Sequence, residues 1–290
     1  MLLGTLIYGL ITSATLALLS IGFNLTFGIS GVANFAYGAL YILTGFGAWI
    51  LFNTLGFPYP LAAVGAVLFS ALFSALMYRF FLLRLRGMVL SEVIATFAMG
   101  LAILELFRYS GFIGSQYTLP VFIEGSLFIS GIYLDAQRLF VVGIAACSTI
   151  LLWLFTRHTR TGRAFKAIAQ NEFTAMTLGI DSDWTATLSV FFGTAYVSLA
   201  AIVILPLGTI SPMAGYSILI NALAVCIVGG LGSTVGVLVA SLIIGYAQQF
   251  TESYVGTHWI MIVSLLAIFL VLCVRPSGLI GHQKELEERI

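Results

Sequence analysis

TRTGRAFKAIAQNEFTAMTLGIDSD, residues 159–183, is a long polar stretch between two apolar segments that are each long enough to cross a membrane. Apolar residues recur with helical spacing over residues 163–178, which predicts a helix there. Its small apolar face is formed by Ala164, Ala167, Ile168, Ala175 and Leu178. Gly179 is suited to end this helix, and residues 181–183 are suited to cap the next one. We expect a short amphipathic helix that joins two membrane spans.

Two interpretations of this helix remain open. Its lysine and arginines could hold it flat on the lipid headgroups, as in other interfacial helices. Alternatively, a protein could grip it. The alanines favour docking, because small side chains anchor poorly in lipid and allow another protein to approach closely.

The composition places the chain in the membrane class. Hydrophobic residues make up 60% and charged residues 8% of the 290 residues, whereas soluble domains carry about 25% charged residues. The net charge of +1, without a basic patch among aromatics, argues against nucleic-acid binding. The three cysteines stand singly in apolar runs and indicate neither a disulfide nor a metal site. No positive stretch precedes the first apolar run, so we expect that run to be a permanent span rather than a signal peptide.

The apolar runs predict an all-α polytopic membrane protein, because each run approaches the length needed to cross a hydrocarbon core of about 30 Å. The runs are residues 5–27, 32–52, 61–82, 89–108, 138–156, 184–207, 217–231, 236–250 and 258–274. The seventh and eighth runs are short, and either a re-entrant pair or two tilted helices would fit them. We therefore expect about eight or nine passages, with residues 1–280 forming one transmembrane domain.

The positive charges orient these passages. If the passages alternate, all the lysines and arginines except Arg108 and Arg138 lie on one side. The positive-inside rule makes that side cytoplasmic. The helix at residues 160–180 and a C-terminal tail at residues 281–290 are then cytosolic, the N-terminus is outside, and the loop at residues 109–137 faces outward.

The chain carries no internal energy source that we can identify. Ion-coupled carriers usually place an ionisable residue deep in the bilayer, but Glu92 and Glu105 lie near the ends of their runs. No phosphate-binding loop, nucleophile and base pair, or cofactor motif is present. We expect a protein that is not an enzyme, needs no cofactor, and either conducts passively or is driven by a separate subunit.

Two interrupted segments point to a substrate route. Residues 28–38 and 208–217 combine glycine, proline or asparagine within the apolar phase, and such irregular backbone is tolerated where it is buried in protein or lines a cavity. Both segments read Ile-Ser-x-x-Ala-x-aromatic-small, 181 residues apart, which suggests an inverted repeat. The candidate pathway residues are Asn34, Tyr37, Ser211 and Asn221. For the two asparagines, hydrogen bonding between helices is an equally good alternative.

Five motifs together resemble one family. They are residues 34–38 (NFAYG), 159–170 (TRTGRAFKAIAQ), 178–180 (LGI), 228–233 (VGGLGS) and 275–281 (RPSGLIG). In this order and spacing the chain resembles the branched-chain amino acid ABC importer permeases, in particular the shorter, H-type subunit. The family usually has histidine and glutamate where this chain has Tyr37 and Ala39, which removes two ionisable groups from the expected pathway or its mouth.

The resemblance implies partners and a mechanism. It implies a second permease in a homo- or heterodimer, two cytosolic ATP-binding subunits and a periplasmic solute-binding protein, all serving one complex in the bacterial inner membrane. It also implies that residues 159–180 fit a groove of an ATP-binding subunit, which gives these candidate coupling residues: Arg163, Lys166, Ala167, Gln170, Ala175 and Gly179. The expected solute is small, polar and organic, with amino acids first. The alternative is a passive channel for a small neutral solute such as urea or an amide.

Overall fold

The computed structural model describes residues 2–31, 33–112, 117–129 and 132–280. In chain order the elements are α1 (Leu2–Ser30), α2 (Tyr37–Trp49), η1 (Ile50–Thr54), α3 (Tyr59–Phe80), η2 (Leu82–Leu85), α4 (Val89–Tyr109), β1 (Ser126–Ile129), β2 (Ile132–Asp135), α5 (Ala136–His158), α6 (Arg160–Gln170), α7 (Glu172–Thr177), α8 (Ser182–Ile204), η3 (Leu205–Leu207), α9 (Ala214–Gly229), α10 (Thr234–Tyr254), η4 (Thr257–Trp259) and α11 (Ile260–Val274). The predicted tail at residues 281–290 lies outside the described residues.

The helices confirm an all-α polytopic membrane fold. Each of the nine apolar runs in the sequence overlaps a helix, and seven helices in the described part are long and apolar enough to cross a membrane. Two helices are shorter: α2 has 13 residues before a five-residue π-helical turn, and α9 has 16. At a rise of about 1.5 Å per residue, α9 reaches only about 24 Å and cannot cross the hydrocarbon core alone.

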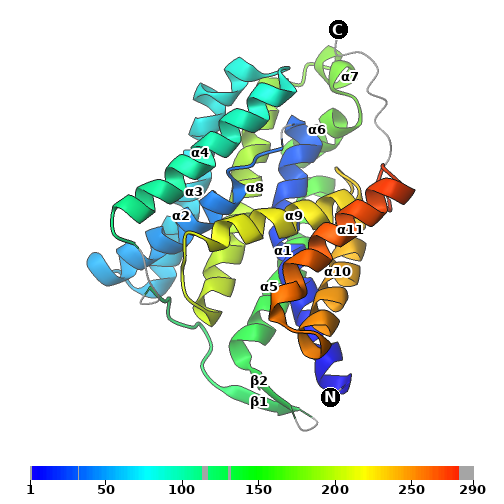
Figure 1. Cartoon of the computed structure of the whole chain (residues 1–290). Helices are drawn as coiled ribbons and strands as arrows, with labels where there is room; N and C mark the ends of the chain where they lie inside the picture. The colour runs from blue at the N-terminus through cyan, green and yellow to red at the C-terminus, as the bar shows by residue number, and fades with distance from the viewer. Residues whose placement is uncertain (1, 32, 113–116, 130–131, 281–290) are drawn as a thin grey trace.

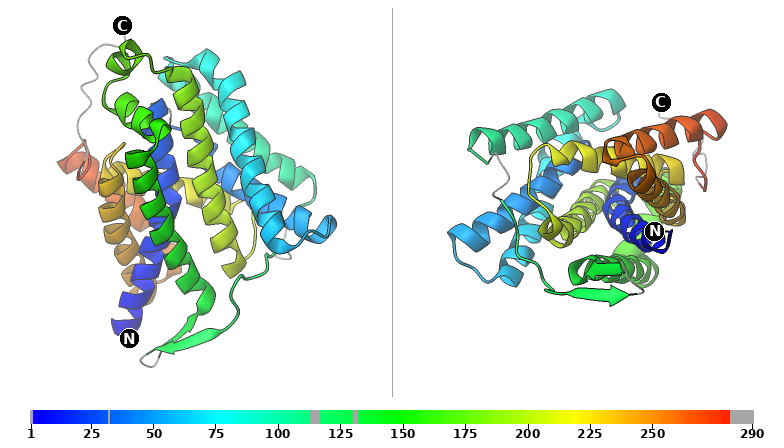
Figure 2. Two further views of the ribbon diagram at one scale, coloured as in Figure 1. Left: turned by 180° about the vertical axis from the view of Figure 1, so that it is seen from behind. Right: turned by 60° about the horizontal axis from the view of Figure 1, so that its bottom comes forward.

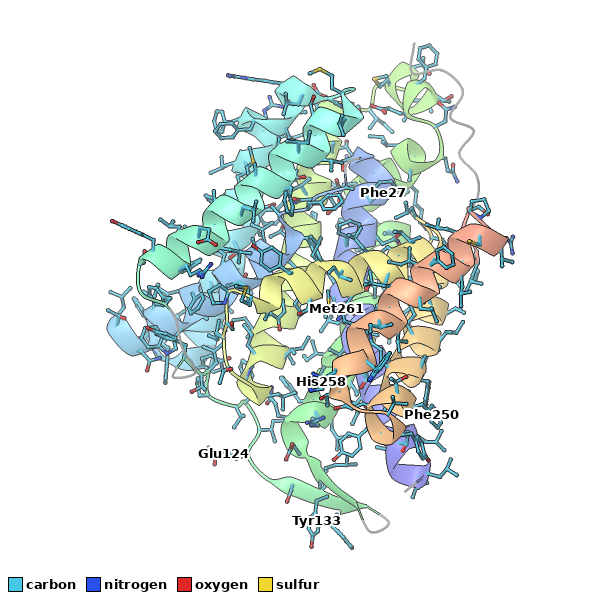
Figure 3. The ribbon with its side chains drawn as sticks, viewed as in Figure 1. Phe27, Glu124, Tyr133, Phe250, His258 and Met261 are labelled. Carbon is cyan, nitrogen blue, oxygen red and sulfur yellow. The ribbon has the colours of Figure 1, made fainter. Side chains whose placement is uncertain are left out.

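One small sheet was not predicted. Strands β1 and β2 form an antiparallel hairpin in which Leu127 faces Leu134 and Phe128 faces Tyr133. Glu124 and Tyr133 mark this end of the molecule, while Phe27 on α1 lies toward the other end (Figure 3). We call these two ends the hairpin end and the α6–α7 end. The segment between α4 and α5 is thus partly ordered as a hairpin.

Helix α1 runs through the centre of the bundle, with α8 and α10 as its main neighbours (Figures 1 and 2). Glycines allow the close approach: a Cβ on Gly22 would overlap the backbone of Gly193 on α8, and a Cβ on Gly245 would overlap Ser13 on α1. Small residues at helix interfaces are typical of membrane bundles, because dispersion contacts replace the hydrophobic effect there. The small residues of α1 therefore set the spacing of the bundle.

Buried hydroxyl groups join α2, α3 and α8. Thr44 Oγ1 lies 2.9 Å from Ser70 Oγ and 2.8 Å from Ser198 Oγ, and all three side chains are buried. One turn farther along α3, Thr194 Oγ1 donates to Ser74 Oγ at 2.7 Å. Interhelical hydrogen bonds of this kind contribute about 0.6 kcal/mol each in membranes, so this row fixes helix register more than it adds stability.

The first interrupted segment separates α1 from α2, as the sequence predicts. Gly31 has φ of 68°, a left-handed conformation that favours glycine, and it ends α1. Asn34 Oδ1 accepts from the Ala36 amide at 3.0 Å, and the Asn34 carbonyl accepts from the Tyr37 amide at 3.2 Å. Asn34 thereby shapes the turn that leads into α2.

The second interrupted segment carries the chain back into the bundle. Residues 208–213 run from the hairpin end of α8 to the middle of the molecule, where α9 begins (Figure 1). The Ile210 amide donates to the Tyr117 carbonyl at 2.8 Å, and Pro212 precedes the first turn of α9. This passage therefore consists of the extended residues 208–213 followed by the short helix α9.

The two interrupted segments meet. Gly38 at the start of α2 and Gly215 at the start of α9 pack so closely that a Cβ on Gly38 would overlap the Gly215 carbonyl oxygen. Under the 181-residue offset of the two motifs, Gly215 corresponds to Asn34 and not to Gly38. The contact thus joins non-equivalent positions, and the inverted repeat stays a prediction.

The glycines of the α9–α10 turn serve close packing. A Cβ on Gly229 would lie 2.5 Å from the backbone of Gly236, and one on Gly278 would lie 2.5 Å from Gly230. The Leu279 amide donates to the Val228 carbonyl at 2.8 Å. Two of the motifs singled out in the sequence therefore pack against each other at the α6–α7 end.

Candidate functional site

The polar stretch that links α5 to α8 folds as two helices. The predicted single helix over residues 163–178 is wrong in one respect, because Asn171 has extended backbone and ends α6. The Asn171 Oδ1 atom accepts from the Thr174 amide at 2.8 Å and so starts α7 in a new direction. The two predicted end signals are confirmed: Gly179 has φ of 83° after α7, and Asp181 Oδ1 caps α8 through the Trp184 amide at 2.9 Å.

One face of α6 packs on the bundle. Phe165 and Ile168 are 2% and 1% exposed, and they form a cluster with Ile29 at the end of α1 and with Ala175 of α7. Thr159 Oγ1 accepts from the Gly162 amide at 2.9 Å and caps α6. The apolar contact attaches α6 and α7 to α1, so the pair is a fixed part of the bundle.

The opposite surface of α6 and α7 is left exposed by the described residues. Arg163, Lys166 and Gln170 are exposed along α6. Three large apolar side chains of α7 and its C-terminal turn are also exposed: Phe173 is 74%, Met176 46% and Leu178 76% accessible. We call Phe173, Met176 and Leu178 the apolar triad. Sequence reasoning missed Phe173 and Met176 because it treated residues 163–178 as one straight helix.

The remaining candidate coupling residues have different surroundings. Ala167 is partly buried against the Phe165 cluster, and Ala175 is 2% exposed within it. Gly179 is exposed at the turn after α7. Of the predicted shared face, Ala167, Ile168 and Ala175 meet in the Phe165 cluster and Ala164 is half-buried, whereas Leu178 is exposed after the break at Asn171. Ala175 thus supports the surface from beneath.

An arginine from a distant part of the chain holds α7 in place. Arg86, in the connection between η2 and α4, forms ion pairs with Glu172 at the start of α7 and with Asp183 in the first turn of α8. Its guanidinium also donates to Ser182 Oγ at 2.7 Å, and Ser182 Oγ donates to Glu172 Oε1 at 2.6 Å. We call these four residues the Arg86 cluster.

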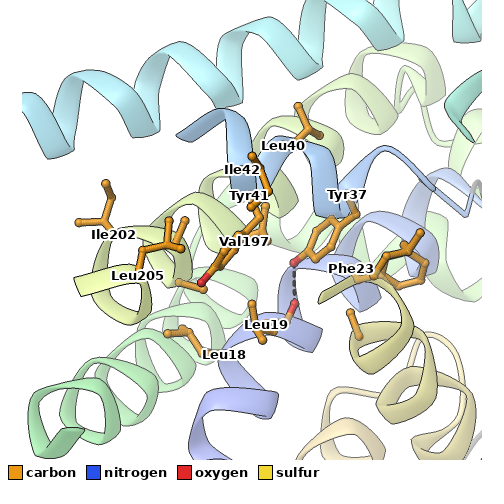
Figure 4. Close-up of a cluster of buried hydrophobic side chains, with 14 of the residues drawn as sticks. Leu18, Leu19, Phe23, Tyr37, Leu40, Tyr41, Ile42, Val197, Ile202 and Leu205 are labelled. Atoms are coloured by element: carbon orange, nitrogen blue, oxygen red, sulfur yellow. Dashed lines mark hydrogen bonds between the residues drawn. The ribbon is translucent and has the colours of Figure 1, made fainter. Parts of the chain in front are cut away.

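Two of the predicted pathway residues are engaged inside the chain. Asn34 is 6% exposed, and its side-chain oxygen accepts from the Ala36 amide in the turn before α2. Tyr37 is 1% exposed, and its hydroxyl donates to the Leu19 carbonyl at 2.6 Å (Figure 4). Phe23 packs edge-on against its ring at 5.4 Å. In this conformation both residues join α1 to α2.

The other two pathway candidates lie on the second interrupted passage. Asn221 Oδ1 accepts from Ser264 Oγ at 2.8 Å and from Gln248 Nε2 at 3.2 Å. These bonds join α9 to α10 and α11, which is the interhelical role that the sequence left as an alternative. Ser211 is half-buried in the extended segment that precedes α9. The structure therefore does not gather the four pathway candidates at one point.

A groove lies where the two interrupted passages meet α4. Its free volume is only about 10 Å³, room for about one water molecule. Its lining residues are Phe35, Gly38, Ala39, Phe97, Gly100, Leu101, Leu104, Gly215, Tyr216 and Leu219. None of these lining residues is charged. The groove is suited to an apolar or neutral group and not to an isolated ion. Its α4 side was not predicted, because a uniformly apolar span does not reveal which face lines a cavity.

The described residues contain no group of three or more His, Cys, Asp or Glu side chains that could hold a metal ion. The only acid found fully buried in them is Glu92, whose Oε1 accepts from the Gly87 amide at 2.9 Å at the start of α4. This places Glu92 in a turn rather than on a proton route through the bilayer.

Comparison with known proteins gives one family. A family profile described as "Branched-chain amino acid transport system / permease component" matches residues 5–272. The high-affinity branched-chain amino acid transport system permease protein LivH of Salmonella typhimurium is 26% identical over 288 residues, covering 94% of each chain. The corresponding protein BraD of Pseudomonas aeruginosa is 26% identical over 292 residues, covering 96% of this chain and 95% of BraD.

A third relative and one solved structure agree with this result. The probable branched-chain amino acid transport permease protein LivH of Methanocaldococcus jannaschii is 30% identical over 299 residues, covering 96% of this chain and 91% of that protein. A chain of PsaBC from Streptococcus pneumoniae in complex with Fab superposes with a TM-score of 0.53 at 13% identity, covering 94% and 92% of the two chains. That likeness concerns the fold alone. The chain is a multi-pass membrane protein that belongs to the family of permease components of branched-chain amino acid transport systems, which are not enzymes themselves.

Proposed function

We propose that this chain is one of two permease subunits of an ATP-driven importer in a bacterial inner membrane. In this proposal an amino acid, branched-chain first, is delivered by a solute-binding protein outside and crosses between the two permeases. Two ATP-binding subunits grip α6 and α7 from the cytosol. The alternative solutes are other small polar organic molecules, such as amides, urea and aromatic acids.

The apolar triad is the observation that carries this proposal. Phe173 and Leu178 are each about three-quarters exposed, on short helices beyond the ends of the long spans. Exposed apolar groups with a polar rim are typical of protein interfaces, and Arg163, Lys166 and Gln170 supply such a rim. A chain without a nucleotide-binding motif would receive force from a partner at this surface.

The face formed by α4, α9 and α11 is the candidate contact surface for the second permease. In the apolar stretch of residues 257–274, which contains α11, only 6% of the residues are buried within the chain, and in that of residues 90–109 in α4 only 28% are buried. Lipid could cover such apolar side chains, but it cannot satisfy the irregular backbone of residues 208–213 that lies beside them at membrane depth. A protein partner or a water-filled passage on this face would account for both the exposed apolar side chains and the irregular backbone. The groove between α2, α4 and α9 then opens toward the dimer interface.

The hairpin end is the candidate contact for a solute-binding protein. The Arg138 guanidinium packs over the Tyr8 ring at 5.3 Å, and the Tyr8 hydroxyl donates to the Tyr133 carbonyl at 3.0 Å. These contacts fix the hairpin on α1 and α5. Arg79, Arg84 and Arg86 lie at the α6–α7 end, so the positive-inside rule directs the hairpin outward.

Reconstitution tests the proposal. The chain is purified with its second permease and ATP-binding subunits, placed in liposomes with ATP inside, and supplied outside with the loaded binding protein. We expect uptake of labelled leucine that requires ATP and the binding protein. Flux through the chain alone, down a gradient and without ATP, would instead establish the passive channel.

A further inference from the structure

We infer that the Arg86 cluster is the mechanical link through which movement of α7 reaches α4 and the interrupted segments that border the groove. Arg86 is a positioning residue in this inference, which rests on the function proposed above. The link joins the surface beside the apolar triad to the candidate transport route. Each step follows contacts between described residues.

The first step is the attachment of α7. This six-residue helix is anchored by the burial of Ala175 against Ile29 and Phe165, by the ion pair of Glu172 with Arg86, and by the hydrogen bond from Ser182 Oγ to Glu172 Oε1. The apolar anchor leads to α1. The ionic anchor leads to the α3–α4 connection, 86 residues earlier in the sequence. A push on Phe173 or Met176 therefore acts on both α1 and Arg86.

The second step is the passage from Arg86 to α4. Gly87, the next residue, has φ of 93° and donates its amide to Glu92 Oε1 at 2.9 Å. Glu92 lies in the first turn of α4 and is 2% exposed. The peptide that carries the guanidinium is thus tied to the start of α4, and the two are expected to move together.

The third step is the contact of α4 with the interrupted segment. Thr96 Oγ1, one turn after Glu92, accepts from the Phe35 amide at 3.2 Å. Gly100, another turn along, packs so closely that its Cβ would lie 3.1 Å from Ala36 Cα. Residues 34–36 lead directly into α2, whose Gly38 contacts the start of α9. A shift of α4 would therefore move the groove walls.

The fourth step concerns the geometry of arginine. One guanidinium reaches Glu172 and Asp183 through different nitrogens and also donates to Ser182. Lysine carries a comparable charge but cannot present this fixed fork. The Arg86 side chain is 22% exposed and those of Glu172 and Asp183 are 37% and 56% exposed, so water screens the pair with Asp183 more than the pair with Glu172. The cluster can thus hold three chain segments in one arrangement.

The unpartnered hydroxyl of Tyr78 adds an independent sign of a second arrangement. Tyr78, near the end of α3, is 1% exposed, and its hydroxyl has no hydrogen-bond partner among the described residues. Its side chain packs with Leu82 of η2 and Ala186 of α8, the two elements that flank Arg86 and Asp183. A buried hydroxyl without a partner costs free energy, and a shift of Arg86 or Asp183 toward it would relieve that cost. The cluster therefore has a ready hydrogen-bond donor for a moved state.

The test uses the complete importer in liposomes and measures three quantities for each variant: co-purified ATP-binding subunit, ATP hydrolysis and solute transported per ATP. We expect Arg86→Ala to keep the subunit and ATP hydrolysis but to lower transport per ATP at least about fivefold, the usual lower range of coupling between sites. Arg84→Ala is the matched control, because Arg84 is an exposed cation on the same connection. It should behave as wild type.

Two milder substitutions test the same link with less risk that the variant misfolds. Glu172→Gln and Asp183→Asn each remove one arm of the cluster, and each should lower transport per ATP, with the double variant losing less than the product of the single losses. Wild-type transport per ATP in all three Arg86, Glu172 and Asp183 variants would overturn the link. So would loss of the ATP-binding subunit in Glu172→Gln, since the cluster would then only support docking. Failure of the wild-type complex to retain that subunit would instead overturn the proposed function.

Discussion

Replacing Phe173 and Leu178 together by aspartate should release the ATP-binding subunits and abolish ATP-driven uptake, while the permease stays folded. Both side chains are at least 74% exposed in this chain, so the substitutions cost the isolated permease little. In the complex each would remove an apolar anchor and bury an unpaired charge. Two interface anchors lost at about 1.4 kcal/mol each weaken binding about 100-fold or more.

Co-purification from mild detergent measures this effect directly. Thr177→Asp is the matched control, because Thr177 is an exposed polar residue of α7 whose hydroxyl bonds only within its own helix, to the Thr174 carbonyl at 2.8 Å. It adds one negative charge to the same surface, where the double variant adds two, without removing an apolar anchor. Wild-type retention of the ATP-binding subunit by the double variant would show that docking occurs elsewhere. Loss in the control as well would show a response to charge alone.

The sequence predicted the membrane spans well for a physical reason. In lipid every backbone amide needs a partner within its own segment, so an apolar run of sufficient length has little choice but to form a helix. The nine runs accordingly overlap helices α1 to α5 and α8 to α11. Positions of the two interrupted segments followed from Gly31 and Pro212, whose backbone preferences do not depend on their neighbours.

The connection between α5 and α8 was predicted less well, because local preference does not decide its shape. Asn171 can continue a helix or cap the next one, and its neighbour Glu172 finds its partner in Arg86, far away in the sequence. A pairing over that distance leaves no periodic signal in one chain. The hairpin formed by β1 and β2 was not predicted, because strands of four residues are too short to show an alternation of apolar and polar side chains.

The transport route was the least predictable part. Asn34 and Asn221 stood out because they are polar in apolar runs, yet both accept hydrogen bonds within the chain. The groove is instead bordered by Phe97 and Leu101, which a span facing lipid could equally contain. Composition marks where polarity is unusual. It does not distinguish a side chain that binds a solute from one that joins two helices.

Replacing Gly38 by alanine should impair both folding and transport, since even one methyl group at this position overlaps the Gly215 carbonyl oxygen. The obstacle is backbone at the start of α9 rather than a side chain that can rotate away. Overpacking of this kind costs about 1–3 kcal/mol, and the shift needed to relieve it would open the groove where α2 meets α9. We expect a lower thermal unfolding midpoint in detergent and little ATP-driven uptake.

Two further substitutions make this a graded test of the α2–α9 contact. A Cβ on Gly215 would lie 3.1 Å from the Gly38 carbonyl oxygen, which is tight but tolerable after a small shift, so Gly215→Ala should be intermediate. Gly47 lies on the same helix as Gly38, and its Cβ would meet Ala66 at an ordinary 3.8 Å. Gly47→Ala should match or slightly exceed the wild type in stability, because alanine favours the helix by about 0.5–1 kcal/mol over glycine. Equal effects at all three positions would mean that the loss of glycine flexibility, and not the close contact, impairs the protein. The expected order of effects instead places the constraint at the junction of the two interrupted passages.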